Sequence, residues 1–342
     1  MSARKIFFND KPLCLSQVDG KRVLVSTADC KIYMVDPPYT GKKLLFEGLS
    51  PISCVEHQNG EIFFGDWNGC VYRMSIDVNE RDSCTGNINT DENSMKGGIN
   101  LPSDGTCPSV TTKRIKNVQN EIEKKHQESA DSSSKKEIER VKNVFIKNAI
   151  IKSMKIFNGN VYVGINQKLI IMDKNLQVKT RINLNNKILC FAVINDQLYM
   201  GMSIPSILRF NNGKIEEIPT AHQSSILCIS TDENGDIVTS SADKTLMVNN
   251  RVVYTGAEWI RVCLCLYFTD GNAVKKRTGK DSSTLFVHEG YVVGLQQNEE
   301  WLFSIGLDRC LTAFRKDGKM KMDVLGDWDE EEEIKRLNDE FG

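Results

Sequence analysis

A frame of eight residues recurs along this chain of 342 residues, and no other feature restricts the fold as strongly. The frame opens with Asp or Asn at a turn, continues as a strand of alternating apolar residues, and closes at a fixed slot. Copies begin at Asp29, Asn68, Asn166, Asp243 and Asp308, as DCKIYMVD, NGCVYRMS, NQKLIIMD, DKTLMVNN and DRCLTAFR. PSILRFNN is a looser copy. Such a period predicts one structural unit stacked several times.

Each frame is one of four strands in a repeating unit. A strand ending in small residues precedes every frame, a third apolar strand lies before it, and a short fourth strand lies upstream of the third. Residues 258–287 hold a further copy, in which WIRVCLCLYF predicts an inner strand and STLFV an outer strand around a degenerate middle. The sequence therefore predicts an all-β fold of seven four-stranded antiparallel units.

Two segments fall outside the repeat. Residues 78–142 contain no Phe, Trp or Tyr and are rich in Ser, Asn, Lys and Glu. Because such a stretch buries too little apolar surface to order itself, we expect a flexible insertion in the second unit, with a short helix at Ile115 to Ile122 as an option. Residues 316–342 form an acidic tail. Without these segments, residues 1–315 give about 36 residues per unit, which suits four strands and their turns.

The two ends of the repeat complement each other. RKIFF at the start has the pattern of an outer strand but no unit before it, and the last unit, ending at Phe314, lacks an outer strand. We expect the N-terminal strand to complete the last unit and close a ring. Closure would remove a free strand edge that invites aggregation.

With these repeats the chain resembles the WD40-type seven-bladed β-propeller family over residues 4–315, less the insertion. Besides the strand-turn frame, two blades carry the family's upstream histidine, at His222 and His288. The resemblance implies that this His, a strand Ser or Thr and the turn Asp form a buried hydrogen-bonded set. Matched by position, the sets are His222, Ser240 and Asp243, and His288, Ser304 and Asp308.

The closing slot departs from the family pattern, because no blade places Trp there. It holds Val35, Met74, Met172, Phe210, Asn249 and Phe314. We therefore expect the slot to need an apolar body, of which tryptophan is one choice.

Patterns that carry chemistry are scarce. The four histidines lack metal-ligand spacing, and the sequence has no Cys-x-x-Cys pair, Gly-rich phosphate loop, nucleophile elbow or His-Glu-x-x-His motif. Propeller enzymes commonly place carboxylates or histidines on the inner strands, where only Glu56 and His57 occur here, at one strand's end. We expect no cofactor, no metal and no enzymatic activity. A propeller hydrolase is the least favoured alternative.

Three residues in connections are candidate partner contacts. Trp67 lies in a turn between the second and third strands of blade two, and Trp259, with Arg261 beside it, lies where blade five leads into blade six. In a propeller both connections open on the same face. Exposed Trp buries a large area at little entropy cost, so both are candidate hot spots. The alternative is that each Trp folds over its own blade.

The acidic tail carries a second candidate contact. Trp328, Ile334, Leu337 and Phe341 lie along one side of a short amphipathic helix that Asp327 or Asp329 can cap. This helix could bind a partner or the propeller's own flank, and a solvated tail is the third option.

Taken together, the sequence favours a WD-repeat scaffold, a monomeric propeller that joins other proteins in a multi-subunit complex. The alternative is a component of a ribosome-biogenesis or RNA-processing assembly, weakly supported by the basic run at 275–277 with Lys280. Scattered cysteines fit a reducing compartment, so we expect the cytoplasm, the nucleus or both. No apolar run reaches the ~18 residues that span a membrane, so no membrane association is expected.

Overall fold

The computed structural model describes residues 3–76, 141–146, 149–211, 213–279 and 281–317. Two compact units make up the chain, residues 1–73 with 143–342, and residues 74–142. The first unit holds a ring of sheets. Of the second, residues 74–76, 141 and 142 are described, at the ends of two strands. The predicted helix near residues 115–122 and most of the predicted insertion lie outside the described residues.

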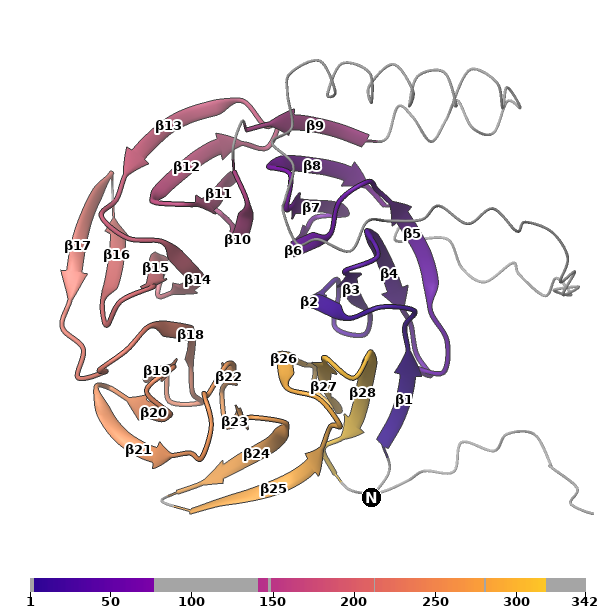
Figure 1. The fold of residues 1–342 in the computed structure, drawn as a ribbon, viewed down its shortest axis with the longest axis vertical. Coiled ribbons are helices and arrows are strands. Elements are labelled where there is room, and N and C mark those ends of the chain that lie inside the picture. The colour runs from indigo at the N-terminus through magenta and orange to yellow at the C-terminus, as the bar shows by residue number, and fades with distance from the viewer. Residues whose placement is uncertain (1–2, 77–140, 147–148, 212, 280, 318–342) are drawn as a thin grey trace, which may run out of the picture. The chain divides into compact units, whose positions relative to one another are not determined.

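Seven antiparallel sheets of four strands form the fold, as predicted (Figure 1). We number them blades one to seven, from the blade of β2 to the blade of β26. The inner strands are β2 (Pro12–Gln17), β6 (Ile52–Gln58), β10 (Ile151–Phe157), β14 (Ile188–Ile194), β18 (Ile226–Thr231), β22 (Cys263–Leu264) and β26 (Val292–Gln297). The second strands are β3 (Val23–Thr27), β7 (Glu61–Asp66), β11 (Asn160–Ile165), β15 (Gln197–Met202), β19 (Ile237–Ser241), β23 (Tyr267–Asp270) and β27 (Trp301–Gly306).

The two outermost strands of each blade complete the sheets. The third strands are β4 (Lys31–Val35), β8 (Cys70–Ser75), β12 (Lys168–Asp173), β16 (Ile207–Asn211), β20 (Thr245–Val248), β24 (Ala273–Thr278) and β28 (Cys310–Arg315). The outer strands are β5 (Lys43–Glu47), β9 (Val141–Phe145), β13 (Val178–Asn183), β17 (Lys214–Ile218), β21 (Arg251–Thr255), β25 (Asp281–Val287) and β1 (Ala3–Phe7). Strand β9 thus begins just inside the range predicted for the insertion.

The ring closes as predicted, because β1 is the outer strand of blade seven. It pairs with β28 from Ala3 opposite Phe314 to Phe7 opposite Cys310. Figure 1 shows the indigo β1 beside the yellow β28. The Arg4 guanidinium lies 5.5 Å from the Trp301 ring of β27, which adds a cation–π contact to the backbone pairing.

The core lies between blades, where each sheet packs on the next. Glycines on the second strands permit this close approach. A Cβ on Gly65 would lie 2.5 Å from Ile151 of the next blade, and one on Gly201 would lie 2.5 Å from Cys190 and 2.9 Å from Ile226. Close packing of this kind makes the ring rigid and tolerates little change in volume.

Blade six is complete, and one prediction about it was wrong. WIRVCLCLYF is not a single inner strand, because β22 covers only Cys263 and Leu264 and the chain then turns at Cys265, whose φ is +53°. The rest of the segment begins β23, and the supposedly degenerate middle contains β24.

The prediction that the closing slot carries an apolar residue is confirmed with one exception. Val35, Met74, Met172 and Phe314 are buried, and Phe210 packs at the edge of a core cluster. Asn249 is exposed, so an apolar body is not required in blade five. Its side chain instead accepts a hydrogen bond from the Ile237 N–H at 3.1 Å and donates to Asp236 at 2.8 Å, which ties the same two strands together.

Candidate interaction face

Strand alternation divides the connections between two faces of the ring. We call the upper face the one that carries the turns between second and third strands and the connections from an outer strand to the next blade. The lower face carries the turns between inner and second strands and those between third and outer strands. Trp67, between β7 and β8, and Trp259, between β21 and β22, both lie on the upper face, as predicted.

Exposed large apolar side chains are distributed unequally between the faces. Six lie in upper-face connections, namely Leu49, Trp67, Ile150, Ile204, Trp259 and Tyr291. The other five lie on outer strands, namely Phe7, Leu44, Phe145, Val252 and Val287. Within the described ranges, none lies in a lower-face connection. Exposed apolar side chains that gather on one face are typical of an interaction surface.

Trp67 is held outward by its turn. Its side chain is 47% exposed, and its backbone N–H donates to the Pro51 carbonyl at 3.0 Å. The preceding Asp66 accepts hydrogen bonds from the N–H groups of Asn68 at 3.0 Å and Cys70 at 2.8 Å, which fixes the turn. The turn that presents Trp67 therefore does not need to reorder in order to meet a partner.

Trp259 belongs to a cluster with Arg261 and Tyr291. The Arg261 guanidinium lies 5.1 Å from the Trp259 ring and 5.3 Å from the Tyr291 ring, so one cation holds two exposed aromatic rings. Among the described residues, no carboxylate forms a salt bridge with Arg261. These three side chains and Glu258 line a hollow of about 320 Å³. Sequence reasoning missed Tyr291, because an isolated aromatic residue in a connection belongs to no pattern.

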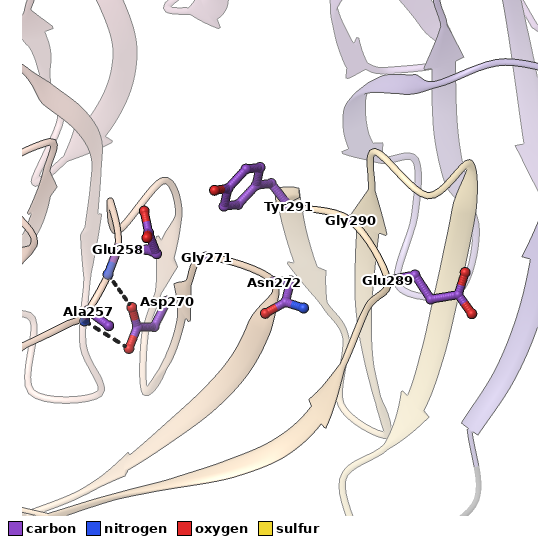
Figure 2. A pocket seen from close by; sticks show the side chains of 8 residues that line it. All are labelled: Ala257, Glu258, Asp270, Gly271, Asn272, Glu289, Gly290 and Tyr291. Carbon is purple, nitrogen blue, oxygen red and sulfur yellow. Dashed lines mark hydrogen bonds between the residues drawn. The ribbon is translucent and has the colours of Figure 1, made fainter.

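A second hollow, of about 410 Å³, adjoins the cluster where blades six and seven meet. Its lining is Ala257, Glu258, Asp270, Gly271, Asn272, Glu289, Gly290 and Tyr291. Figure 2 shows Tyr291 reaching over the turn at Gly271 towards Glu258. The hollow combines acidic groups with one aromatic face and opens on the upper face.

Asp270 fixes the wall of this hollow. It accepts a hydrogen bond from the Glu258 N–H at 3.0 Å (Figure 2). It also accepts one from the Tyr254 hydroxyl at 2.7 Å, and Lys275 Nζ lies 3.5 Å away. Burial alone would raise the pKa of Asp270, but these hydrogen bonds outweigh it and lower the pKa. The carboxylate stays charged and pins the Trp259 connection to blade six.

The basic side chains at 275–277 contact acidic and aromatic side chains of the propeller itself. Lys275 contacts Asp270 and Tyr254, and Arg277 pairs with Asp232 at 3.1 Å. Lys276 lies over the Tyr267 ring at 6.0 Å. Lys280 lies outside the described residues. Paired cations have less to offer to phosphate, which weakens the RNA alternative.

The structure brings one predicted histidine set together in full. His288 Nδ1 lies 2.9 Å from Asp308, and its Nε2 lies 2.7 Å from the Ser304 hydroxyl. Burial lowers the pKa of His288, although Asp308 opposes the shift. The neutral ring therefore joins β27 to the turn before β28.

The other set was wrong in one member. His222 Nδ1 contacts Asp243 at 2.9 Å, but its Nε2 contacts the Thr239 hydroxyl at 2.9 Å rather than Ser240. Neighbouring strand residues face opposite sides of a sheet, so only one of the two can reach the ring. Burial would raise the pKa of Asp243, but hydrogen bonds from Thr245, the Gln223 N–H and His222 bring it down to about 2.

One carboxylate occurs on the seven described inner strands. Glu56 accepts hydrogen bonds from Lys155 Nζ at 3.0 and 3.1 Å, so the two charges neutralise each other. Burial raises the pKa of Glu56, and Lys155 opposes the shift. His57 instead accepts a hydrogen bond from the Gly60 N–H at 3.2 Å. Within the described ranges, no group of three or more His, Cys, Asp or Glu is placed to hold a metal ion.

Two further predictions have a limited outcome. Trp328, Ile334, Leu337 and Phe341 lie outside the described residues, so their role stays a prediction. None of the described residues forms a helix with the length and apolar character needed to cross a bilayer.

These features define a WD40-type seven-bladed β-propeller fold. The WD40 β-propeller domain of Doa1 superposes with a TM-score of 0.63 at 9% sequence identity, covering 92% of this chain and 96% of that one. Virginiamycin B lyase from Staphylococcus aureus superposes with a TM-score of 0.62 at 11% identity, covering 91% of this chain and 98% of that one. No family model and no curated protein matches the sequence. At these identities the likeness concerns the fold alone, which occurs both in a WD40 domain and in a lyase.

Proposed function

We propose that this protein is a non-enzymatic scaffold that binds partner proteins on the upper face of its propeller, within a multi-subunit complex of the cytoplasm or nucleus. One observation carries the proposal: every exposed large apolar side chain in a described connection lies on that face. Trp67 and the cluster of Trp259, Arg261 and Tyr291 are its anchors, because rigid aromatic and Arg side chains dominate binding energy at protein interfaces.

The two anchors suit different parts of one partner surface. Leu49, Trp67 and Ile150 lie in connections around blade two, whereas the Trp259 cluster lies over blades five to seven beside an acidic hollow. The first set favours an apolar contact and the second a mixed one.

Cross-linking of the complex tests which face is used. The tagged full chain is purified with its partners, treated with an amine-reactive cross-linker and analysed by mass spectrometry. Exposed lysines report both faces: Lys11, Lys187 and Lys244 lie in upper-face connections, and Lys21 and Lys174 in lower-face turns. We expect partner cross-links at the three upper-face lysines. Cross-links confined to the two lower-face lysines would contradict the proposal.

Substitution tests the anchors themselves. We expect Trp67→Ala with Trp259→Ala to reduce partner recovery at least about tenfold, since loss of one anchor commonly costs more than about 1 kcal/mol. The matched control is Val252→Ala with Val287→Ala, two outer-strand residues of similar exposure. Equal recovery from wild type and both double variants, with unchanged thermal unfolding, would remove the anchors from the interface.

A further inference from the structure

Cysteines occupy an equivalent position on several inner strands. In six blades the inner strand has a bulge near its start, and the residue after the bulge pairs with the second strand. These residues are Cys14, Cys54, Ser153, Cys190, Cys228 and Gly294. The Cys14 thiol lies 3.9 Å from the Val55 carbonyl, and the Cys190 thiol lies 3.9 Å from the Ile226 carbonyl. At this position a thiol therefore faces the next blade.

Blade six breaks this pattern. Its inner strand β22 has two residues, and Cys263 pairs with Phe268 and packs with Val238 of blade five. The Cys263 thiol lies 3.7 Å from the Val238 carbonyl and 3.6 Å from the Ser230 hydroxyl. It thus faces back towards blade five, whereas the thiols of the pattern face forward.

Two thiols consequently meet at the junction of blades five and six. Cys228 faces forward and its sulfur lies 3.3 Å from the Cys263 carbonyl. The Cys263 sulfur lies 3.6 Å from the hydroxyl of Ser230, which stands two residues after Cys228 on the same strand. As a residue Cys228 is partly exposed, although its thiol is enclosed by the junction, whereas Cys263 is buried, so Cys228 is the member of the pair nearer the surface. This is the arrangement of an attacking thiol and a resolving thiol.

The surroundings distinguish Cys228 from the equivalent cysteines. The hydrogen bond from the Cys263 thiol outweighs burial and lowers the pKa of Cys228. Burial raises the pKa of Cys14 to about 11 and also raises the pKa values of Cys54 and Cys190. Because the thiolate is the nucleophile, a lowered pKa favours Cys228 over Cys14, Cys54 and Cys190 as the attacking thiol.

We propose that Cys228 and Cys263 form a redox-active dithiol, which hydrogen peroxide oxidises to a disulfide between blades five and six. The Cys228 thiolate attacks one peroxide oxygen, the O–O bond breaks, and the departing hydroxide takes up a proton to become water. The Cys263 sulfur then attacks the Cys228 sulfenic acid, the S–OH bond breaks, and the Cys263 proton joins the leaving hydroxide as a second water. Two thiols and one peroxide thus give one disulfide and two waters.

The bridge would tie β18 to the two-residue strand β22. Ile260, next to Trp259, is fully buried and packs in the same cluster as Cys263. Oxidation therefore acts directly beneath the Trp259 connection. That oxidation alters partner binding rests on the proposed function, whereas formation of the disulfide does not.

Peptide mapping of the full chain tests the chemistry. After peroxide treatment and alkylation without reductant, trypsin leaves Cys228 in residues 215–244 and Cys263 with Cys265 in residues 262–275. Chymotryptic cleavage after Leu264 then separates the last two. We expect a cross-linked pair of Cys228 and Cys263 that has lost two hydrogen atoms. A bridge from Cys228 to Cys190 or Cys265, or no bridge at all, would overturn the proposal.

Substitutions assign the order of events. With Cys263→Ser, we expect a sulfenic acid at Cys228 that dimedone traps, and no disulfide. Cys54→Ser, at the equivalent position of blade two, is the control and should leave the bridge intact. For wild type, we expect iodoacetamide to alkylate Cys228 at least about tenfold faster than Cys14, since each pKa unit changes the thiolate fraction tenfold. Equal labelling rates would refute the role of Cys228, whether or not the variants fold.

Discussion

Removing the imidazole of His288 should destabilise blade seven by an amount that the structure lets us divide. The substitution His288→Ala deletes the 2.7 Å bond to Ser304, whose hydroxyl is fully buried, and an unpaired buried hydroxyl costs about 1–3 kcal/mol. It also deletes the contact with Asp308, worth about 1.5 kcal/mol, although Asp308 still accepts the Glu289 N–H at 3.1 Å. With the space that the ring leaves, we expect a loss of about 4 kcal/mol.

A double-mutant cycle isolates the buried bond. Ser304→Ala alone should cost about 1.5 kcal/mol, because it leaves His288 Nε2 unpaired. Combined with His288→Ala, it should cost less than the sum by about 1.5 kcal/mol, since no buried hydroxyl is then stranded. Urea unfolding of the full chain, monitored by tryptophan fluorescence, gives the free energies of unfolding. In thermal unfolding, the midpoint temperature of His288→Ala should be about 10 °C below that of wild type.

The matched control is His57→Ala, because His57 is half-buried and its partners are the backbone groups of Gly60 and Val18 rather than a buried side-chain hydroxyl. It should cost under about 1 kcal/mol. Strict additivity in the cycle, or equal effects of the His288 and His57 substitutions, would refute the assignment of His288 as a buried strut between β27 and the β28 turn.

Three other outcomes follow from the same structure. Because the pKa of His288 is lower in the folded chain than in the unfolded chain, its contribution to stability should be full above about pH 6.5 and should fall as the pH drops below that value. The midpoint temperature of thermal unfolding should therefore depend less on pH between pH 5 and 7 in His288→Gln than in wild type. Gly201→Ala should cost about 2 kcal/mol in urea unfolding, whereas Gly20→Ala, with no atom within 4 Å, should cost almost nothing. Deleting residues 1–7 should expose the β28 edge and give concentration-dependent oligomers in light scattering, unlike wild type.

The architecture could be predicted from the sequence because it depends on features that repeat. Alternating strands, turn residues and the unmatched outer strand at the start specify seven sheets and their closure. Blade six escaped a correct assignment because β22 is only two residues long and a non-Gly residue, Cys265, takes a left-handed backbone conformation. Neither property leaves a periodic signal.

An equal distance in sequence between the hydroxyl residue and the turn Asp would have identified Thr239 as the partner of His222. Ser304 stands four residues before Asp308, and Thr239 stands four residues before Asp243. Ser240 is one residue out of register, which in a strand means the opposite face. Asn249 shows that the apolar pattern does not predict every slot. This polar residue joins two strands through side-chain hydrogen bonds, where other blades use apolar packing.

The candidate interaction face was only partly predictable, and the reason lies in how a propeller is built. Each of the seven sheets packs against two neighbours, so the same strand positions are buried in every blade and their residues follow a pattern. A connection contacts few neighbours, so Tyr291 or Ile204 carries no signal until the strands around it are placed. The same freedom lets connections vary without disturbing the ring, which is why binding residues gather there. The proposed dithiol links a strand position to a connection. Cys263 departs from the strand pattern at the junction of blades five and six, and its buried cluster includes Ile260 of the Trp259 connection.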